Sequence, residues 1–99
     1  MREAAVERHL VAVVRKLGGE ALKFTSPGRR HVHDRLVLLP GGEVWFVETK
    51  APGAKPRAGQ VRFHALLKRL RCATVVLDTK EKIDAWAFGN SDEAWRTVL

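Results

Sequence analysis

Hydrophobic residues recur along the chain with two periods, and these periods predict helices and strands in a defined order. Apolar residues three or four positions apart are typical of a helix with one face on a core, whereas short alternating or continuous apolar runs are typical of strands. Helices are predicted over residues 3–17, 57–70 and 80–88, with a last helical turn within 91–99. Strands are predicted over residues 20–25, 34–39, 43–50 and 72–77. The predicted order is therefore αβββαβ followed by a helical tail.

The most continuous apolar strand is expected at the centre of the sheet. Residues 36–39 carry four apolar side chains without a polar break, which is typical of a strand buried on both faces. The strand over 72–77 directly follows a helix, so we expect it to cross over and pair in parallel. On that preceding helix we expect Phe63 at the edge of the inward face and these residues within it: Val61, Leu66, Leu67 and Leu70.

Two charged residues end the third apolar strand. Glu48 and Lys50 are two positions apart, so their side chains project from the same face of a strand. A three-residue turn at Pro40-Gly41-Gly42 pairs Asp34 with Glu48 across the hairpin. A two-residue turn would pair Asp34 with Thr49 instead. Because a three-residue turn with a late glycine is a common hairpin form, we predict that the two carboxylates face each other.

The predicted pairing of Asp34 with Glu48 brings two like charges together. Two carboxylates at this distance repel unless a cation lies between them. A hard divalent ion such as Mg²⁺ takes oxygen ligands, so the two acids predict a metal site, and the backbone carbonyl of Thr49 is a further possible ligand. Lys50 would lie beside the ion, where it can orient water or stabilise phosphoryl charge. The structural alternative is a salt bridge from Lys50 to Asp34 or Glu48 at the strand end.

Glu7 occupies an unusual position for an acid. It borders the apolar stripe of the first helix, three residues before Leu10. From this position alone, Glu7 is either a solvated residue at the flank of the stripe or a surface partner of Arg8 or Arg15.

Composition favours one small domain with a nucleic-acid partner. The 99 residues, 45% of them hydrophobic, suffice for a single core, so we treat residues 1–99 as one domain. The net charge of +7 suits contact with phosphate backbones, with a merely solvated basic surface as the alternative. A lone Cys72 allows no internal disulfide, and no stretch is typical of a membrane span or a secretory signal. We therefore expect a cytoplasmic protein without a membrane partner.

Basic residues and histidines gather in the loops beside the predicted site. The four basic residues that we expect to contact phosphate, unless they are merely solvated, are Arg29, Arg30, Lys55 and Arg57. His31 and His33 are either a pair of transition-metal ligands or contacts to phosphate and solvent.

An ordered set of residues resembles the PD-(D/E)xK nuclease superfamily and, within it, the small stand-alone members of the VRR-NUC family (virus-type replication-repair nuclease). The matching positions are Asp34 with the apolar strand after it, Pro40-Gly41-Gly42, Glu48-Thr49-Lys50, Pro56 and Gln60. The resemblance runs from Glu7 to about Leu77. The chain departs from the family at His31 and His33, where glycine and proline are usual, and at His64, where related nucleases often carry tyrosine.

The resemblance implies a restriction-endonuclease-like fold, with a mixed four-stranded sheet flanked by helices, and a role for each matched residue. Asp34 and Glu48 would be metal ligands and Lys50 the catalytic lysine. Glu7 would match the helical acid that helps to hold a metal or positions the lysine. Gln60 would match the glutamine that faces the site. The family also implies a homodimer in a bacterial or phage-infected cell.

The sequence thus favours an Mg²⁺- or Mn²⁺-dependent nuclease that hydrolyses DNA, with branched or junction DNA as the expected substrate. A non-catalytic nucleic-acid-binding domain that retains the basic loops is one alternative. An RNase or toxin on the same scaffold is another, and it would share the metal site.

Overall fold

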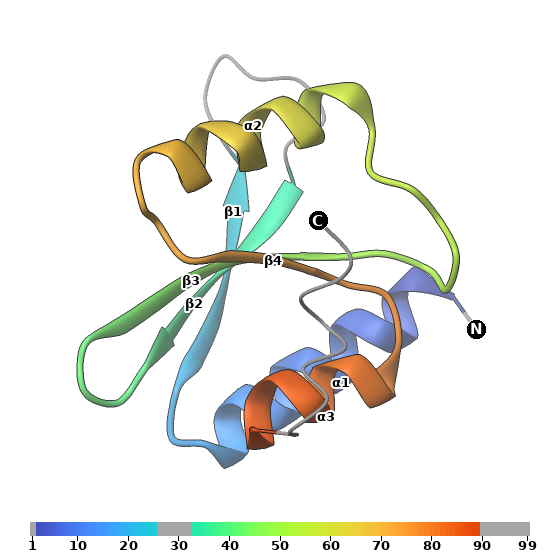
Figure 1. The fold of residues 1–99 in the computed structure, drawn as a ribbon. Helices are drawn as coiled ribbons and strands as arrows, with labels where there is room; N and C mark the ends of the chain where they lie inside the picture. The colour runs from blue at the N-terminus through green and yellow to red at the C-terminus, as the bar shows by residue number, and fades with distance from the viewer. Residues whose placement is uncertain (1, 26–32, 90–99) are drawn as a thin grey trace.

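The chain folds into a four-stranded sheet with helices on both faces (Figure 1). The computed structural model describes residues 2–25 and 33–89, except for the side chains of residues 33 and 34. The elements are α1 (Glu3–Lys16), β1 (Glu20–Thr25), β2 (His33–Leu39), β3 (Glu43–Thr49), α2 (Ala58–Arg69), β4 (Thr74–Leu77) and α3 (Lys80–Phe88). Each begins and ends within two residues of its predicted bounds, which confirms the αβββαβ order. The helical turn expected within 91–99 lies outside the described residues.

The sheet has the order β1-β2-β3-β4, antiparallel over its first three strands and parallel between β3 and β4. This confirms both the central position of β2 and the crossover after α2. The β2–β3 hairpin pairs Leu39 with Glu43 and Arg35 with Val47, so its turn has three residues, as predicted. Gly41 and Gly42 have φ angles of 87° and 79°, a left-handed backbone that glycine adopts without steric cost.

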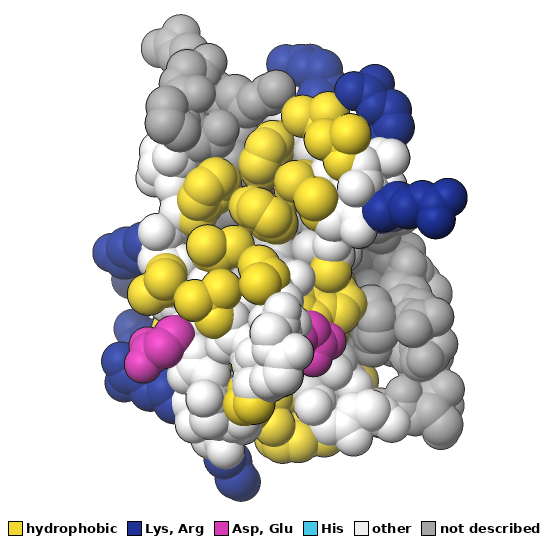
Figure 2. Space-filling model, turned by 90° about the vertical axis from the view of Figure 1, so that its left-hand side faces the viewer, with side chains coloured by type: hydrophobic (Ala, Val, Ile, Leu, Met, Phe, Trp, Pro, Cys, Tyr) yellow, Lys and Arg dark blue, Asp and Glu magenta, His cyan; other side chains and the backbone are white. Residues whose placement is uncertain are grey.

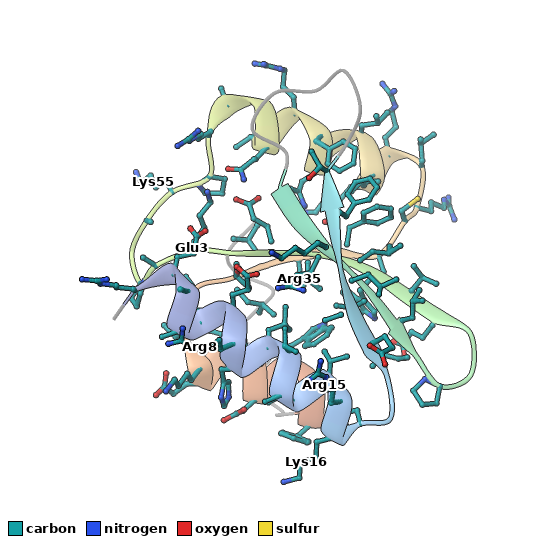
Figure 3. The ribbon with its side chains drawn as sticks, turned by 180° about the vertical axis from the view of Figure 1, so that it is seen from behind. Glu3, Arg8, Arg15, Lys16, Arg35 and Lys55 are labelled. Carbon is teal, nitrogen blue, oxygen red and sulfur yellow. The ribbon has the colours of Figure 1, made fainter. Side chains whose placement is uncertain are left out.

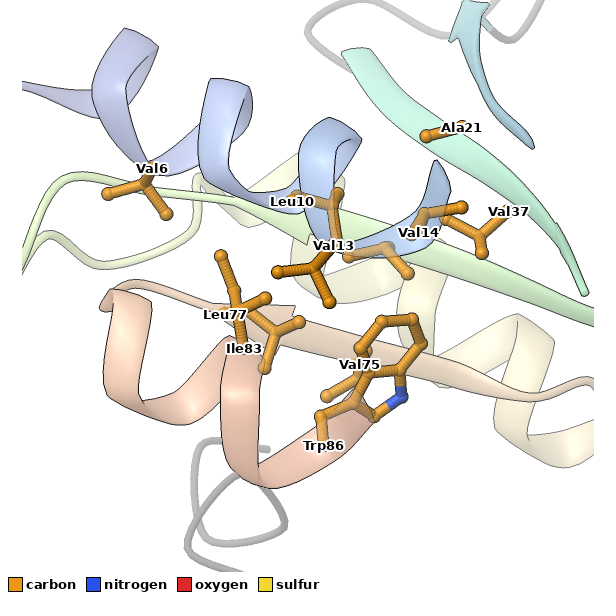
Figure 4. Packing of buried hydrophobic residues seen from close by; sticks show 11 residues of the cluster. Val6, Leu10, Val13, Val14, Ala21, Val37, Val75, Leu77, Ile83 and Trp86 are labelled. Carbon is orange, nitrogen blue, oxygen red and sulfur yellow. The ribbon is translucent and has the colours of Figure 1, made fainter. Parts of the chain in front are cut away.

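α1 and α3 pack side by side on one face of the sheet and enclose the main core (Figures 1 and 4). The apolar side chains that fill it are Val6, Leu10, Val13, Val14, Ala21, Val37, Val47, Val75, Leu77, Ile83 and Trp86. The hydroxyl of Thr79 caps α3 by accepting a hydrogen bond from the Lys82 amide (3.0 Å). None of the described helices is long and apolar enough to cross a membrane.

α2 covers only part of the opposite face of the sheet. Phe63 and Leu67 pack there against the rings of Phe24 and Phe46. Further along the same face, other apolar side chains stay exposed (Figure 2). They are Leu22 (45%), Leu38 (38%) and Val44 (44%). The expectation that residues 36–39 are buried on both faces is therefore wrong, because α2 is too short to reach this end of the sheet.

The inward face of α2 also differs from the prediction. Val61 and Leu70 are 54% and 61% exposed, whereas Gln60 and His64 are buried. Phe63, expected at the edge, is central to the packing. The face of α2 that packs on the sheet is therefore not the one that the apolar residues predict. Gln60 and His64 face inward instead, and His64 has a charged partner, Glu48, on β3.

Candidate active site

The carboxylate of Glu48 lies at the centre of a buried polar cluster near the end of β3. The whole residue is fully buried. The Nζ atom of Lys50 lies 3.2 Å from Oε2 of Glu48, so the two charges share one side of the strand, as their spacing predicts. The Nε2 atom of His64 lies 3.1 Å from the other oxygen, Oε1. The salt bridge that formed the structural alternative is thus present, with Glu48 as its acid.

Backbone pairing fixes where this cluster stands. β3 pairs on one side with β2 and on the other with β4, where Glu48 is opposite Val76 and Thr49 opposite Leu77. The Lys50 amide continues the ladder by donating to the Leu77 carbonyl (3.1 Å). Because Glu48 lies within an interior strand, its carboxylate is held at a defined position rather than on a mobile loop.

Both carboxylate oxygens of Glu48 keep capacity to bind a further group. Neither takes part in a well-oriented hydrogen bond within the described part of the chain, although Lys50 and His64 lie within ion-pair distance. Lys50 and His64 are close to these oxygens but not aligned with them, so lone pairs of the carboxylate stay unsatisfied. Buried polar atoms without a hydrogen bond are rare in folded proteins. A hard divalent cation is a fitting partner for such oxygens. Among the described side chains, however, no group of three or more His, Cys, Asp or Glu residues could by itself hold a metal ion.

Asp34 stands at the start of β2, where its backbone pairs with Phe24 of β1. On the other side, the last pair of the β2–β3 ladder is Arg35 with Val47. The next position of the same register aligns Asp34 with Glu48, as the three-residue turn predicts. The side chains of Asp34 and His33 lie outside the description, and so does the whole of His31.

Glu7 has a partner that its position on the helix did not indicate. The Arg35 guanidinium donates to Oε1 of Glu7 from Nε (3.1 Å) and also from its NH2 group. Its remaining NH1 group donates to the Ala21 carbonyl (2.9 Å). Figure 3 shows Arg35 between the sheet and α1. Pairing with Arg8 or Arg15 is therefore not what holds Glu7, whose side chain is 33% exposed.

A pocket of about 230 Å³ connects Glu7 with the Glu48-Thr49-Lys50 segment. Glu7, Arg35 and Thr49 all line it, together with the end of β1. Thr49 alternates with Glu48 along β3 and so projects from the opposite face of the sheet. The structure thus places Glu7 beside the motif but on the side of the sheet that α1 covers, whereas Glu48 contacts α2.

Gln60 has a structural role in addition to any role in the site. It is 4% exposed, and its Oε1 accepts a hydrogen bond from the Arg57 amide (2.9 Å) at the start of α2. Lys55 and Arg57 are exposed in the segment that leads into this helix, as phosphate contacts require. Figure 3 shows Lys55 in this segment. Arg29 and Arg30 lie outside the described residues.

His64 is the site residue that the sequence reasoning missed. It is 2% exposed, contacts Glu48, and also forms a hydrogen bond to Thr74 through Nδ1. A signal for it was present: Gln60, Phe63, His64 and Leu67 follow the i, i+3, i+4, i+7 spacing of one helix face. The apolar residues alone indicated a different inward face, and His64 was assigned no role, so the buried histidine was not recognised.

Comparisons with known proteins support the resemblance seen in the motifs. No family model matches the chain. The chain is 56% identical over 81 residues to "Putative nuclease p44" of Acyrthosiphon pisum secondary endosymbiont phage 1, which covers 82% of this chain and 87% of that protein. A solved structure described as "VRR_NUC domain" matches with a TM-score of 0.82 and 29% identity, covering 89% of this chain and 96% of that one.

The fold, the acid–lysine pair at the end of β3 and these similarities define an α/β domain of nuclease type. The chain belongs to the VRR-NUC family.

Proposed function

We propose that the protein is a metal-dependent deoxyribonuclease of the PD-(D/E)xK type that acts on branched or junction DNA in replication, repair or recombination. The observation that carries this proposal is the buried carboxylate of Glu48, which has Lys50 beside it and no well-oriented hydrogen bond among the described residues. In a metal-dependent nuclease, such an acid binds a divalent ion, and the ammonium group beside it faces the phosphate of the substrate.

The proposed ligands of Mg²⁺ or Mn²⁺ are the carboxylates of Asp34 and Glu48, the Thr49 carbonyl and Glu7. The β2–β3 register supports the pairing of the first two. Glu7 borders the pocket that Thr49 also lines, which supports its inclusion. Arg35 already binds the carboxylate of Glu7. Of the four proposed ligands, Glu7 is therefore the one that we expect to depend most on a rearrangement of its side chain or of Arg35.

When bound, such an ion supplies charge neutralisation at the scissile phosphate and activation of the attacking water. Lys50 stabilises the negative charge that develops on the phosphoryl group, because its ammonium already lies beside the acid that holds the ion. Gln60 uses its carbonyl oxygen to cap α2, which leaves its NH2 group to orient water or phosphate.

The basic residues of the two flanking loops bind the DNA backbone in this proposal. Arg29, Arg30, Lys55 and Arg57 contribute charge that positions the duplex without reading its sequence, as phosphate contacts generally do. The net charge of +7 supports the same assignment.

We further propose that residues 1–99 act as one nuclease domain, that two copies associate into a homodimer, and that the protein works in the bacterial or phage-infected cytoplasm. The exposed apolar side chains on the sheet face that α2 leaves open support association, since apolar patches on small domains commonly mark interfaces. Light scattering coupled to gel filtration measures the mass directly, and a monomer at micromolar concentration would refute the dimer.

The decisive experiment is a cleavage assay with purified protein on labelled four-way junctions, flaps and linear duplexes, each with Mg²⁺, Mn²⁺ or EDTA. We expect metal-dependent cutting, strongest on branched DNA, and loss of cutting in Asp34→Asn, Glu48→Gln and Lys50→Met. Glu43→Gln is a matched control, because it makes the same change at the other end of β3. Equal cutting by Glu48→Gln and wild type would refute the proposal.

A non-catalytic nucleic-acid-binding domain is the competing function, and the Glu48–Lys50 ion pair favours it, since that pair can be purely structural. It predicts that DNA binding persists without cleavage of any substrate in any metal. An RNase of the same fold would instead cut matched RNA substrates faster than DNA.

A further inference from the structure

His64 is buried on the side of α2 that faces the sheet, and it contacts two adjacent strands. The residue lies on α2 and is 2% exposed. Its Nδ1 atom shares a hydrogen bond with the hydroxyl of Thr74, the first residue of β4. Its Nε2 atom lies 3.1 Å from Oε1 of Glu48 on β3. The imidazole therefore connects a hydroxyl on one strand to the acid on the next.

In a neutral ring, the chemistry of these two contacts selects one tautomer. An ionised carboxylate only accepts hydrogen bonds, so the ring atom facing Glu48 must carry a hydrogen. In a neutral imidazole the other nitrogen then has a lone pair and needs a donor. The Thr74 hydroxyl supplies that donor. A threonine hydroxyl that donates to Nδ1 thus leaves the N–H group of His64 on Nε2, the ring atom that lies 3.1 Å from Oε1 of Glu48.

We propose that His64 is a positioning residue that Thr74 holds in the Nε2–H tautomer and that orients Glu48 to receive a divalent ion. This inference rests on the proposed function, in which Glu48 is a metal ligand. His64 approaches Oε1 while Lys50 approaches Oε2, so each carboxylate oxygen has its own neighbour. A ligand already held in one orientation loses less freedom on binding, which raises affinity for the ion.

Packing alone does not account for the residue. The His64 ring stacks edge-on against Phe63 at 6.3 Å between centroids, a contact that an apolar ring would make equally well. Each nitrogen of a buried imidazole needs a suitable polar neighbour: an N–H group needs an acceptor, and a lone pair needs a donor. Its role is therefore tested by changes that remove hydrogen-bonding capacity and keep shape.

Nitrogen NMR of the full-length protein with ¹⁵N-labelled histidine tests the tautomer without metal or substrate. His64→Gln identifies the His64 signals by their loss. We expect one protonated nitrogen, Nε2, in the wild type and a changed tautomer ratio in Thr74→Val. A wild-type ring protonated at Nδ1, or at both nitrogens, would overturn the inference.

Manganese binding tests the consequence for Glu48. By electron paramagnetic resonance we expect Thr74→Val to bind Mn²⁺ about 10-fold more weakly than wild type, the lower bound usual when a partner of a metal ligand is removed. Thr74→Ser keeps the hydroxyl and should bind as wild type does. Equal affinity of Thr74→Val and wild type, or equal losses in the valine and serine variants, would contradict the role.

Failure of the proposed function gives a different result. A wild type that binds no Mn²⁺ at all would overturn both proposals, whereas Mn²⁺ binding without any cleavage of DNA would overturn the proposed function alone. If only the present inference fails, wild-type binding stays intact and Thr74→Val matches it. Circular dichroism of each variant shows whether the fold is retained, and valine is well suited to a strand position.

Discussion

Replacing Lys50 by methionine leaves a buried carboxylate without its nearest cation. The Glu48 side chain is 1% exposed and that of Lys50 12%, so water cannot take over the interaction. At the 3.2 Å separation, two unit charges attract by about 5 kcal/mol if the effective dielectric constant is about 20. Desolvation offsets much of that attraction in the intact pair, but removing one partner of a buried pair costs about 3–5 kcal/mol.

We expect the lower end of this range, about 3 kcal/mol, because His64 still faces the other carboxylate oxygen. In a domain of this size each kcal/mol lowers the melting temperature by about 4–8 °C, so the fall should be on the order of 12–24 °C. Calorimetry in EDTA measures the fall without interference from metal. The double variant Glu48→Gln, Lys50→Met removes both charges and should regain most of the lost stability.

Lys82→Met is the matched control for the loss of a lysine. Its Nζ lies 3.1 Å from Asp78, but its side chain is 29% exposed, and pairs near the surface contribute only about 0.2–1 kcal/mol. If Lys50→Met costs no more than this control, the reasoning is refuted: Glu48 is then either uncharged or open to water in solution.

Three further changes test other parts of the structure. Thr79→Ala removes the N-cap of α3 and should cost about 1 kcal/mol in urea unfolding, with an unchanged m value. Gly19→Ala should cost about 1–3 kcal/mol in the same assay, because the added Cβ would lie 2.3 Å from the Leu38 carbonyl oxygen; unaltered stability would refute this close approach. Glu7→Gln still accepts from Arg35, so we expect DNA cleavage to fall at least about 10-fold while the melting temperature changes little; full activity would remove Glu7 from the proposed ligands.

The features that the sequence predicted best are those that depend on neighbouring residues. The three-residue turn at Pro40-Gly41-Gly42 was predictable because its glycines adopt φ angles that other residues resist, and the turn length then sets the hairpin register. The same local logic places Glu48 and Lys50 on one side of β3, where the structure finds them in contact.

The features that the sequence reasoning missed depend on residues distant along the chain. Glu7 is held by Arg35, 28 positions away, and no helical spacing indicates that partner. His64 turns inward because its partners come from two strands, at Glu48 and Thr74. Hydrophobic periodicity assigns polar residues to the outside of a helix, so it fails where a buried polar cluster makes the inside favourable for them.

The observed ion pair does not exclude the proposed metal site, although the sequence presents the two as alternatives. A fully buried carboxylate needs positive charge beside it in every state of the protein. Lys50 supplies that charge in the metal-free protein, which explains why a costly buried lysine is present at a strand end. A divalent ion at Glu48 would supply the same compensation, and the ammonium would then be available to a phosphate. We infer that the pair which stabilises the fold without metal is also the pair that serves the chemistry with it, so loss of stability and loss of cleavage in Lys50→Met have one cause.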